Sequence, residues 1–308
     1  MKLSYALCLA AAGAFALSAQ AEEHLKSLNP QGISKEIPAG TDFYHHVNKK
    51  WMEANPLTDE YSRYGMFNIL NDSSNNRVRR IVTGLAATNP KPGTNAYKIA
   101  SLYEAAMDST RRNKLGAQPI QAHLKKIENA KPEEMTDLFL WMHKEYGSPL
   151  IGAGPSEDLG NSKVYSMYVS GPGLGLGDRD YYLKNDKRNK SVREAYQKLI
   201  NRMMVLAGYK KGDAARIAKN VMKIEKLIAD STWTREESRN LPAMYNVRTI
   251  DQVKDMYPHF PWDRFFIETM GIESPETVIV TNINTAKQGD NLMASLSDRE
   301  KKDLYLWE

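Results

Sequence analysis

The stretch "GPGLGLGDRDYYL", residues 171–183, places four glycines at alternate positions before two aspartates, an arginine and two tyrosines. A loop that cradles a phosphate needs a preceding strand, a helix beginning at its last glycine, and either G-x-G-x-x-G spacing or a following Lys-Ser/Thr pair. The spacing here is G-x-G-x-G, and Asp178 and Asp180 would repel a phosphate. We interpret the segment as a tight irregular connection, in which glycine adopts backbone conformations that other residues avoid.

The first 21 residues have the pattern of a secretory signal peptide. Lys2 gives a positive start, residues 3–17 are mostly apolar, and Ala19-Gln20-Ala21 forms a small-x-small cleavage site. The apolar run is too short for a stable membrane span, and no later stretch approaches the required length. The sequence therefore predicts an exported protein, periplasmic or secreted, with no membrane span in its mature chain.

Composition narrows the class of protein further. The single cysteine, Cys8, lies inside the signal, so the mature chain forms no disulfide, as is typical of bacterial exported proteins stabilised by their core. Removal of the signal removes one basic residue, Lys2, and no acid. The mature chain then has 41 basic and 37 acidic residues and a net charge of about +4. The basic residues occur in short clusters with acids nearby, such as Lys49-Lys50, which indicates solvated helix faces and argues against nucleic-acid binding.

Most of the chain has the periodicity of amphipathic helices. A polar lead-in over 22–40 precedes a helix capped by Thr41/Asp42 and a second helical pattern over 63–87. Asn95 is expected to cap a third helix. Its predicted apolar face consists of Ile99, Leu102, Tyr103, Ala106 and Met107.

The later helices are marked by prolines and by capping residues. Pro119 and Pro132 stand where the first turns of two helices are expected. Helical periodicity resumes over 192–208 and 217–228, and Ser297 to Glu300 has the sequence of a capping box. The fold class predicted is mainly α.

Short β-branched and aromatic runs interrupt the helices in the middle of the chain. "PLIGAGPSED" and "KVYSMYVSG" predict a β-hairpin that leads into the glycine loop, and "ETVIVTN" predicts one more strand. The sequence contains no internal repeat and no clear linker.

No motif for zinc hydrolysis or nucleophilic catalysis is present. None of the six histidines forms H-E-x-x-H, and the adjacent His45 and His46 would point about 100° apart on a helix, which suits ordinary surface or packing residues. The sequence contains no G-x-S-x-G and no mature cysteine. Asp178 and Asp180 could form an acid pair for glycoside cleavage, but neighbouring acids that flank Arg179 are more typical of structural salt bridges.

Four ordered stretches together resemble the N-terminal part of the neprilysin-like zinc metallopeptidases, a family that includes endothelin-converting-enzyme-like and bacterial endopeptidase O-like members. They are "DFYHHVNKKWMEANPLTDEYSRYGMFNIL" (42–70), "KIASLYEAAMDSTRRNKLG" (98–116), "GLGLGDRDYYL" (173–183) and "MYNVRTIDQV" (244–253). The family's glycine loop typically reads G-L-G-L-P-x-R-D-Y-Y, and Gly177 replaces its proline here. The resemblance covers essentially the whole mature chain.

The resemblance implies the helical cap domain of that fold, with a small β-hairpin, over 41–308, and an incomplete enzyme. Family members are about twice as long, and the zinc ligands and the catalytic glutamate lie in their C-terminal half. No catalytic or metal-binding residue and no cofactor is therefore expected in this chain, and zinc is expected only for the full-length enzyme. Peptide substrates and a complementing C-terminal half are the implied partners.

The resemblance also assigns individual residues. Arg63 is similar to a family arginine that reaches toward the carboxylate end of bound peptides, as a guanidinium fork suits a carboxylate. Asn71 replaces a second family arginine, and a salt bridge from Arg63 to Asp59, Glu60 or Asp72 is the structural alternative. The residues implied to form a structural signature of the cap domain, with Arg179 tying the loop to a helix and the tyrosines packing, are Gly173, Gly175, Arg179, Asp180, Tyr181 and Tyr182.

Two functions of different classes follow. The first is the N-terminal segment of an exported zinc metalloendopeptidase of small peptides, inactive alone, which supplies the cap and part of the cavity wall. The second is a non-catalytic exported module that binds peptides or a partner protein. An apolar helix that stops at Glu308 without a cap favours the first, and exposed apolar helix faces with aggregation or tight association are then expected.

Overall fold

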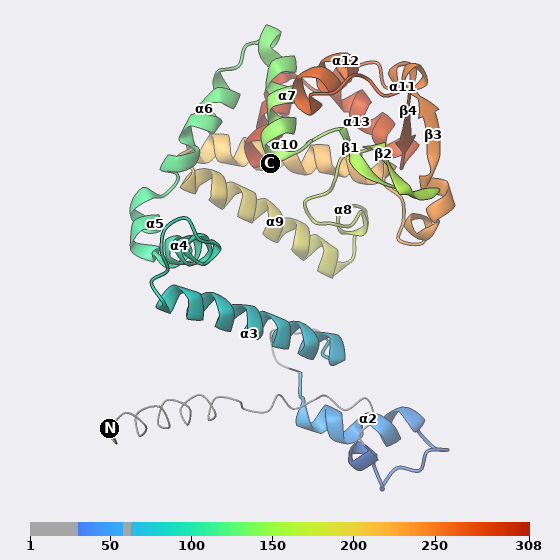
Figure 1. Cartoon of the computed structure of the whole chain (residues 1–308). Helices are drawn as coiled ribbons and strands as arrows, with labels where there is room; N and C mark the ends of the chain where they lie inside the picture. The colour runs from blue at the N-terminus through green and yellow to red at the C-terminus, as the bar shows by residue number, and fades with distance from the viewer. Residues whose placement is uncertain (1–29, 58–62) are drawn as a thin grey trace, which may run out of the picture. The chain divides into compact units, whose positions relative to one another are not determined.

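The structure is a computed structural model of the chain and describes residues 30–57 and 63–308. The predicted signal peptide and residues 22–29 of the lead-in lie outside the described residues. The chain forms two compact units, which we call unit 1 (residues 1–108) and unit 2 (residues 109–308). Figure 1 labels their helices and strands. The prediction of a single helical domain over 41–308 stays a prediction.

The regular elements in the described residues of unit 1 are all helical. Its elements are the 3-10 turn η1 (Pro30–Gly32) and the helices α2 (Phe43–Ala54), α3 (Met66–Ala87) and α4 (Asn95–Met107). Asp42 caps α2 as predicted, accepting a hydrogen bond from the backbone N–H of His45 at 3.0 Å. The cap predicted at Asn95 is wrong by one residue, because the side chain of Thr94 accepts from the N–H of Tyr97 at 3.1 Å.

The apolar side chains of unit 1 lie mostly in solvent. Among its described residues, the only buried apolar one is Ala100. Phe67 on α3 is 88% exposed, and Leu102, in the centre of the predicted apolar face of α4, is 74% exposed. An amphipathic helix ordinarily turns its apolar stripe toward a core. In unit 1 the predicted helices form, but their apolar stripes stay uncovered.

Unit 2 combines helices with one small sheet. Its helical elements are α5 (Ser109–Leu115), η2 (Gln118–Ile120), α6 (Gln121–Asn129), η3 (Pro132–Glu134), α7 (Met135–Tyr146), α8 (Asp180–Leu183), α9 (Lys187–Leu206), α10 (Lys211–Ser231), η4 (Glu237–Arg239), η5 (Leu241–Met244), α11 (Ile250–Met256), α12 (Trp262–Arg264), the π-helix η6 (Phe265–Met270), α13 (Ile283–Ser295) and α14 (Asp298–Trp307). Across the described ranges, no helix has both the length and the apolarity needed to cross a membrane.

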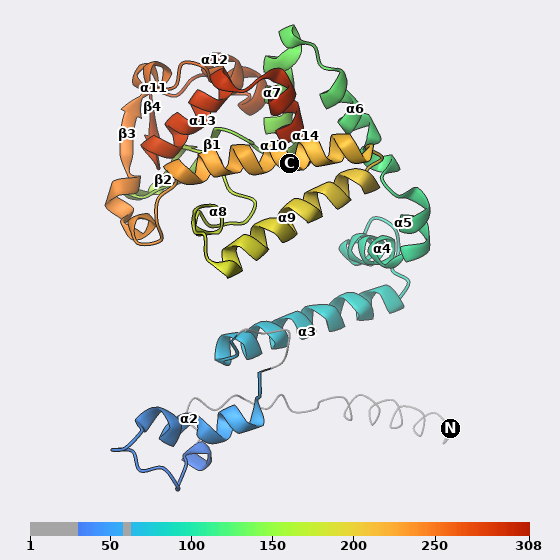
Figure 2. The ribbon, with the colours of Figure 1, turned by 180° about the vertical axis from the view of Figure 1, so that it is seen from behind.

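Helix α10 lies at the centre of unit 2. Figures 1 and 2 show α9 running beside it, and α8, α13 and α14 also contact it. Its buried positions recur every three or four residues, which is the signature of a helix packed along one side. They are Ala214, Ile217, Ala218, Val221, Ile224, Glu225, Ile228 and Ala229. Glu225 is the exception in this apolar series.

The sheet has four strands in the order β1-β2-β4-β3. Strands β1 (Gly152–Asp158) and β2 (Asn161–Ser170) form the predicted antiparallel hairpin, and β4 (Thr277–Val280) confirms the strand predicted in "ETVIVTN". β4 runs parallel to β2, and the short edge strand β3 (Asn246–Thr249) pairs antiparallel with β4. β3 was not predicted, because four residues with one apolar side chain carry too little alternation to indicate a strand.

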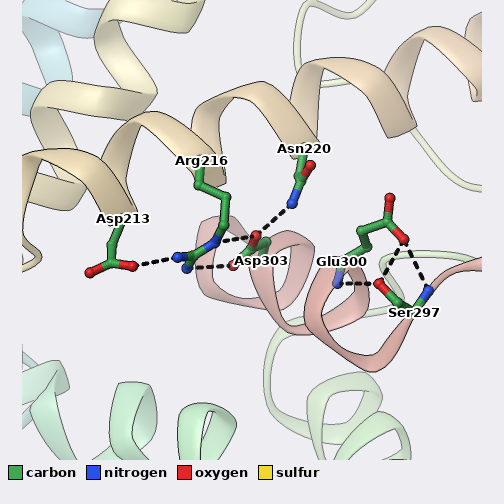
Figure 3. A network of polar contacts seen from close by, with 6 residues as sticks. All are labelled: Asp213, Arg216, Asn220, Ser297, Glu300 and Asp303. Atoms are coloured by element: carbon green, nitrogen blue, oxygen red, sulfur yellow. Dashed lines mark hydrogen bonds and ion pairs between the residues drawn. The ribbon is translucent and has the colours of Figure 1, made fainter.

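An ion pair between a buried carboxylate and a half-buried guanidinium joins α14 to α10. Asp303 on α14 is fully buried, and its carboxylate accepts two hydrogen bonds from the guanidinium of Arg216 at 3.1 and 3.2 Å and one from the side chain of Asn220 at 2.7 Å. Figure 3 shows these side chains converging, with the capping box predicted at Ser297 and Glu300 at the start of α14. The described end of the chain is therefore held to the central helix by charge as well as by apolar contact.

His143 on α7 makes the stability of unit 2 dependent on pH. Its Nε2 atom is buried without a hydrogen-bond partner among the described residues, and its ring lies 4.6 Å from that of Phe265. Burial lowers the pKa of His143. Stability is therefore fully present above about pH 6.5, the ordinary value, and falls below it, because the unfolded state takes up a proton that the folded state resists.

We expect His143→Leu to reduce this loss of stability between pH 7.5 and 5.5. Urea unfolding of the wild type and the variant at both pH values measures the difference. An equal loss in both proteins would show that His143 is not its source.

Candidate functional site

The glycine loop lies directly against the buried carboxylate of Glu225. The backbone N–H of Gly175 donates to Oε1 of Glu225 at 3.3 Å. A Cβ atom at position 175 would lie 2.7 Å from the same oxygen and would overlap the hydroxyl of Tyr196. A side chain at this position would therefore force the hydroxyl of Tyr196 to move away from Glu225.

Two phenol groups complete the surroundings of Glu225. Tyr182 donates to Oε2 at 2.7 Å, and Tyr196 donates to Oε1 at 2.9 Å. The hydroxyl of Tyr182 also accepts from the N–H of Leu176 at 2.9 Å, so the loop is bound from both sides. Glu225 is 2% exposed. We call Glu225, Tyr182, Tyr196 and the loop residues 173–177 the Glu225 cluster.

The electrostatics of the cluster favour a structural role. Burial raises the pKa of Glu225, while hydrogen bonds from Tyr182 and Tyr196 act in the opposite direction. Burial raises the pKa of both tyrosines, and the negative charge of Glu225 raises it further. Both tyrosines therefore stay protonated and can donate hydrogen bonds. Both carboxylate oxygens accept hydrogen bonds from the protein itself, and the carboxylate is buried. This arrangement supports the interpretation of the glycine loop as a structural connection.

The two acids of "DRDYY" each form an ion pair. Asp178 forms an ion pair with Arg235, and Asp180 forms one with Lys184 at 2.7 Å. Both acids thus have the salt-bridged character that the sequence favours over an acid pair for catalysis.

The expected tie between Arg179 and a helix stays a prediction, and the charge of Arg179 contributes to lowering the pKa of Glu237 at the start of η4. Its Nε atom is buried without a hydrogen-bond partner in the described part of the chain. Arg193 on α9 also holds this segment, donating to the carbonyls of Tyr181 at 2.6 Å and Lys184 at 2.7 Å. Tyr182 is buried as expected, whereas Tyr181 is half-buried.

Gly177 gives the loop a conformation that the family's usual proline could not adopt. Its φ is +73°, and its N–H donates to the carbonyl of Leu174 at 2.8 Å. Proline has φ near −65° and no N–H. We expect Gly177→Pro to lower the free energy of unfolding by about 3 kcal/mol and Gly177→Ala by about 1 kcal/mol, because alanine meets open space there but pays for positive φ. Equal urea midpoints for the two variants would contradict this.

Arg63, the predicted peptide-binding residue, lies just before α3 and is exposed. Among the described residues it has no hydrogen bond or ion pair. Asp59 and Glu60, two of its predicted alternative partners, lie outside the described residues, and Asp72 accepts from the hydroxyl of Tyr64 at 3.3 Å. The contact of Arg63 with a peptide stays a prediction, and Asn71 at the start of α3 is also exposed.

The histidines do not fit a zinc site. Within residues 30–57 and 63–308, no group of three or more His, Cys, Asp or Glu side chains is placed to hold a metal ion. His45 is bonded to the carboxylate of Asp42 at 2.7 Å, and His46 to the carbonyl of Ile37 at 2.6 Å. The two adjacent histidines thus each bind a group within their own unit.

Comparison with known proteins places these features in a family. A sequence profile described as peptidase family M13, from its N-terminal region, matches residues 39–308. The chain belongs to peptidase family M13. Drosophila melanogaster Neprilysin-3 is 24% identical over 292 residues, and endothelin-converting enzyme 1 of Rattus norvegicus is 25% identical over 278 residues.

Solved M13 structures have the same fold. Mycobacterium tuberculosis zinc metalloprotease Zmp1, solved with an inhibitor, matches with a TM-score of 0.78 at 24% identity, over 91% of this chain and 43% of its own. PepO from Lactobacillus rhamnosis matches with a TM-score of 0.66 at 17% identity, over 88% of this chain and 42% of its own. The mainly α fold and the resemblance to an N-terminal neprilysin-like region are thereby confirmed.

The M13 alignments cover most of this chain but only part of each relative. The alignments cover 90% and 86% of this chain but only 37% of Neprilysin-3 and 36% of the rat enzyme. The chain thus spans little more than a third of the length of these relatives.

Sequence reasoning found the glycine loop but missed Glu225, Tyr196 and Arg193, which hold it.

Proposed function

We propose that this chain is the N-terminal region of an exported neprilysin-like zinc metalloendopeptidase that cleaves small peptides. It supplies the helical cap and part of the wall of the substrate cavity, and the zinc site comes from elsewhere. The observation that carries the proposal is the M13 match over 39–308 in a sequence with no H-E-x-x-H. The cleavage of small peptides and the role as a cap follow from the M13 match, and export follows from the signal-like first 21 residues.

The Glu225 cluster supports the part assigned to the cap. A cavity wall must keep its shape without a bound ligand, and here the glycine loop, α8, α9 and α10 are joined by hydrogen bonds to one buried carboxylate. Ligand sites in proteins are usually largely pre-formed. Rigidity of the loop, rather than chemistry in it, is the contribution we assign to "GLGLGDRDYYL".

Arg63 is the residue we assign to the peptide. Its guanidinium is exposed, and a planar fork of N–H donors can bind a peptide carboxylate through two parallel hydrogen bonds. With Asn71 in place of a second arginine, we propose only weak selection for a free C-terminal carboxylate. Zinc would be held, and the attacking water activated, by residues outside this chain.

Peptide cleavage by the mature chain, alone and after co-expression with the C-terminal region of an M13 relative, tests the proposal. We expect no cleavage by the chain alone and chelator-sensitive cleavage of short peptides in the complemented sample. A chain that stays a folded monomer, binds peptides unaided and gains no activity from any C-terminal region would instead be the non-catalytic binding module.

A further inference from the structure

Unit 2 has a small pocket whose lining includes no residue of the Glu225 cluster. It lies where α7, the segment before α12, α13 and α14 meet, and Figures 1 and 2 show these elements on the same side of α10. Phe139 and Pro261 supply apolar walls, whereas His259, Lys301 and Tyr305 bring polar groups. The volume is about 100 Å³. Since a water molecule takes up about 30 Å³ in the liquid, the pocket suits a group of a few heavy atoms.

Tyr305 on α14 brings a hydroxyl that the protein does not bind. Tyr305 is 3% exposed and lines the pocket, and its hydroxyl makes no hydrogen bond within the described residues. The unpartnered groups sealed from solvent in that part of the chain belong to other residues, so this hydroxyl reaches the pocket. Burial raises the pKa of Tyr305, and the negative charge of Asp298 raises it further. The hydroxyl therefore stays protonated and can donate.

His259 is held in place by a buried acid. Asp290 on α13 is fully buried, and its carboxylate accepts a hydrogen bond from the backbone N–H of His259 at 2.8 Å. The second carboxylate oxygen lies 3.0 Å from Nδ1 of the same residue. Because a carboxylate is an acceptor, Nδ1 carries the proton, and Nε2 of the neutral ring is an acceptor. Nε2 has no hydrogen-bond partner among the described residues.

The charges at the pocket favour an anion. Lys287 lies 3.5 Å from the carboxylate of Asp290 and offsets its charge. Lys301 is half-buried, and its side chain forms no ion pair within residues 30–57 and 63–308. Lys301 and Tyr305 are four positions apart, so they share one side of α14. The pocket thus combines a cationic donor, a neutral donor and an imidazole nitrogen that accepts.

We propose that this pocket binds a phosphate group, either as free phosphate or as a small phosphate monoester. The charged oxygens of phosphate accept hydrogen bonds from Lys301 and Tyr305, and a protonated oxygen donates to Nε2 of His259. The second pKa of a phosphate ester is about 6, so the protonated form is available near neutral pH. Sulfate and carboxylate ions have the acceptors without this proton. The site does not depend on the peptidase assignment.

Calorimetric titration of the purified chain with inorganic phosphate, methyl phosphate and sulfate, at about pH 6.5, tests the site. We expect one phosphate per chain with a dissociation constant on the order of 0.1 to 1 mM. Sulfate should bind about tenfold more weakly, because it leaves Nε2 without a donor. Tighter binding of methyl phosphate than of phosphate would assign the site to an ester, and the reverse order would assign it to the free ion.

Two variants each remove one donor. Tyr305→Phe removes only the hydroxyl, and Lys301→Met removes the charge but keeps most of the stem. Each should weaken phosphate binding about tenfold or more. The matched control is Arg299→Met, which removes the same charge from an exposed position of α14 and should bind as the wild type does. Thermal melting of Tyr305→Phe should match the wild type, because the hydroxyl has no bond to lose.

Three results would overturn the phosphate site. The first is the absence of saturable phosphate binding by the wild type. The second is binding that both variants retain, or that Arg299→Met weakens as much as Lys301→Met does, since the phosphate would then lie elsewhere or respond to net charge alone. The third is sulfate binding as tight as phosphate binding, which would remove the role given to Nε2 of His259. All three leave the proposed function standing.

Discussion

Gly175→Ala is expected to lower the free energy of unfolding by about 3 to 5 kcal/mol. The new Cβ would overlap the hydroxyl of Tyr196 and lie 2.7 Å from Oε1 of Glu225. Gly175 itself is exposed, but the ring of Tyr196 that must move lies in the core, where overpacking costs about 1 to 3 kcal/mol, and displacing a donor from the buried carboxylate adds a similar amount. Urea unfolding followed by circular dichroism measures the loss.

Gly173→Ala is the control for this prediction. A Cβ at Gly173 has no heavy atom within 4 Å. Its expected change is below about 1 kcal/mol, and its sign can be favourable because alanine restricts the unfolded chain. Similar losses at the two glycines would contradict the role given to the Glu225 cluster.

Arg216→Met is expected to cost about 3 to 5 kcal/mol. The substitution leaves the carboxylate of Asp303, which is fully buried, with only the side chain of Asn220 as a donor. Removing one partner of a buried ion pair costs more than the pair contributes, because the remaining charge stays away from water. A double variant, Arg216→Met/Asp303→Leu, should regain most of the stability.

Lys223→Met provides the comparison on the same two helices. Lys223 pairs with Glu300 at 2.6 Å, but its side chain is exposed, and such pairs contribute about 1 kcal/mol or less. A loss for Arg216→Met no larger than that for Lys223→Met would show that the buried pair does not hold α14 to α10. Both losses can be read from the same urea titrations.

The elements were largely predictable from the sequence, because periodicity and caps are local. Asp42, Ser297 and the hairpin after Pro149 each act within a few residues of their own position. The misses were local as well: Thr94 rather than Asn95 caps α4, since either residue can accept the bond. Strand β3 was too short to show a pattern.

The cluster that holds the glycine loop was not predictable in the same way. Glu225 bonds to Tyr182 and Tyr196, which lie 43 and 29 positions away along the chain. One signal was available, because Glu225 falls four residues after Val221 on the apolar side of α10. A glutamate on the apolar side of a helix signals something unusual, but the sequence does not show whether or how the fold accommodates its carboxylate.

Periodicity also could not show what covers an apolar stripe. The faces of α3 and α4 were predicted correctly as apolar, yet Phe67 and Leu102 lie in solvent. A helical pattern identifies the side that avoids water, whereas the identity of the covering surface is a property of the assembled protein.

Zinc stoichiometry of the purified mature chain tests the central claim most directly. After equilibration with micromolar zinc and gel filtration, we expect far less than one zinc per chain, because no described group of ligands can hold it and the sequence has no H-E-x-x-H. About one zinc per chain, retained through gel filtration and accompanied by peptide cleavage, would contradict the assignment of this chain to the cap alone.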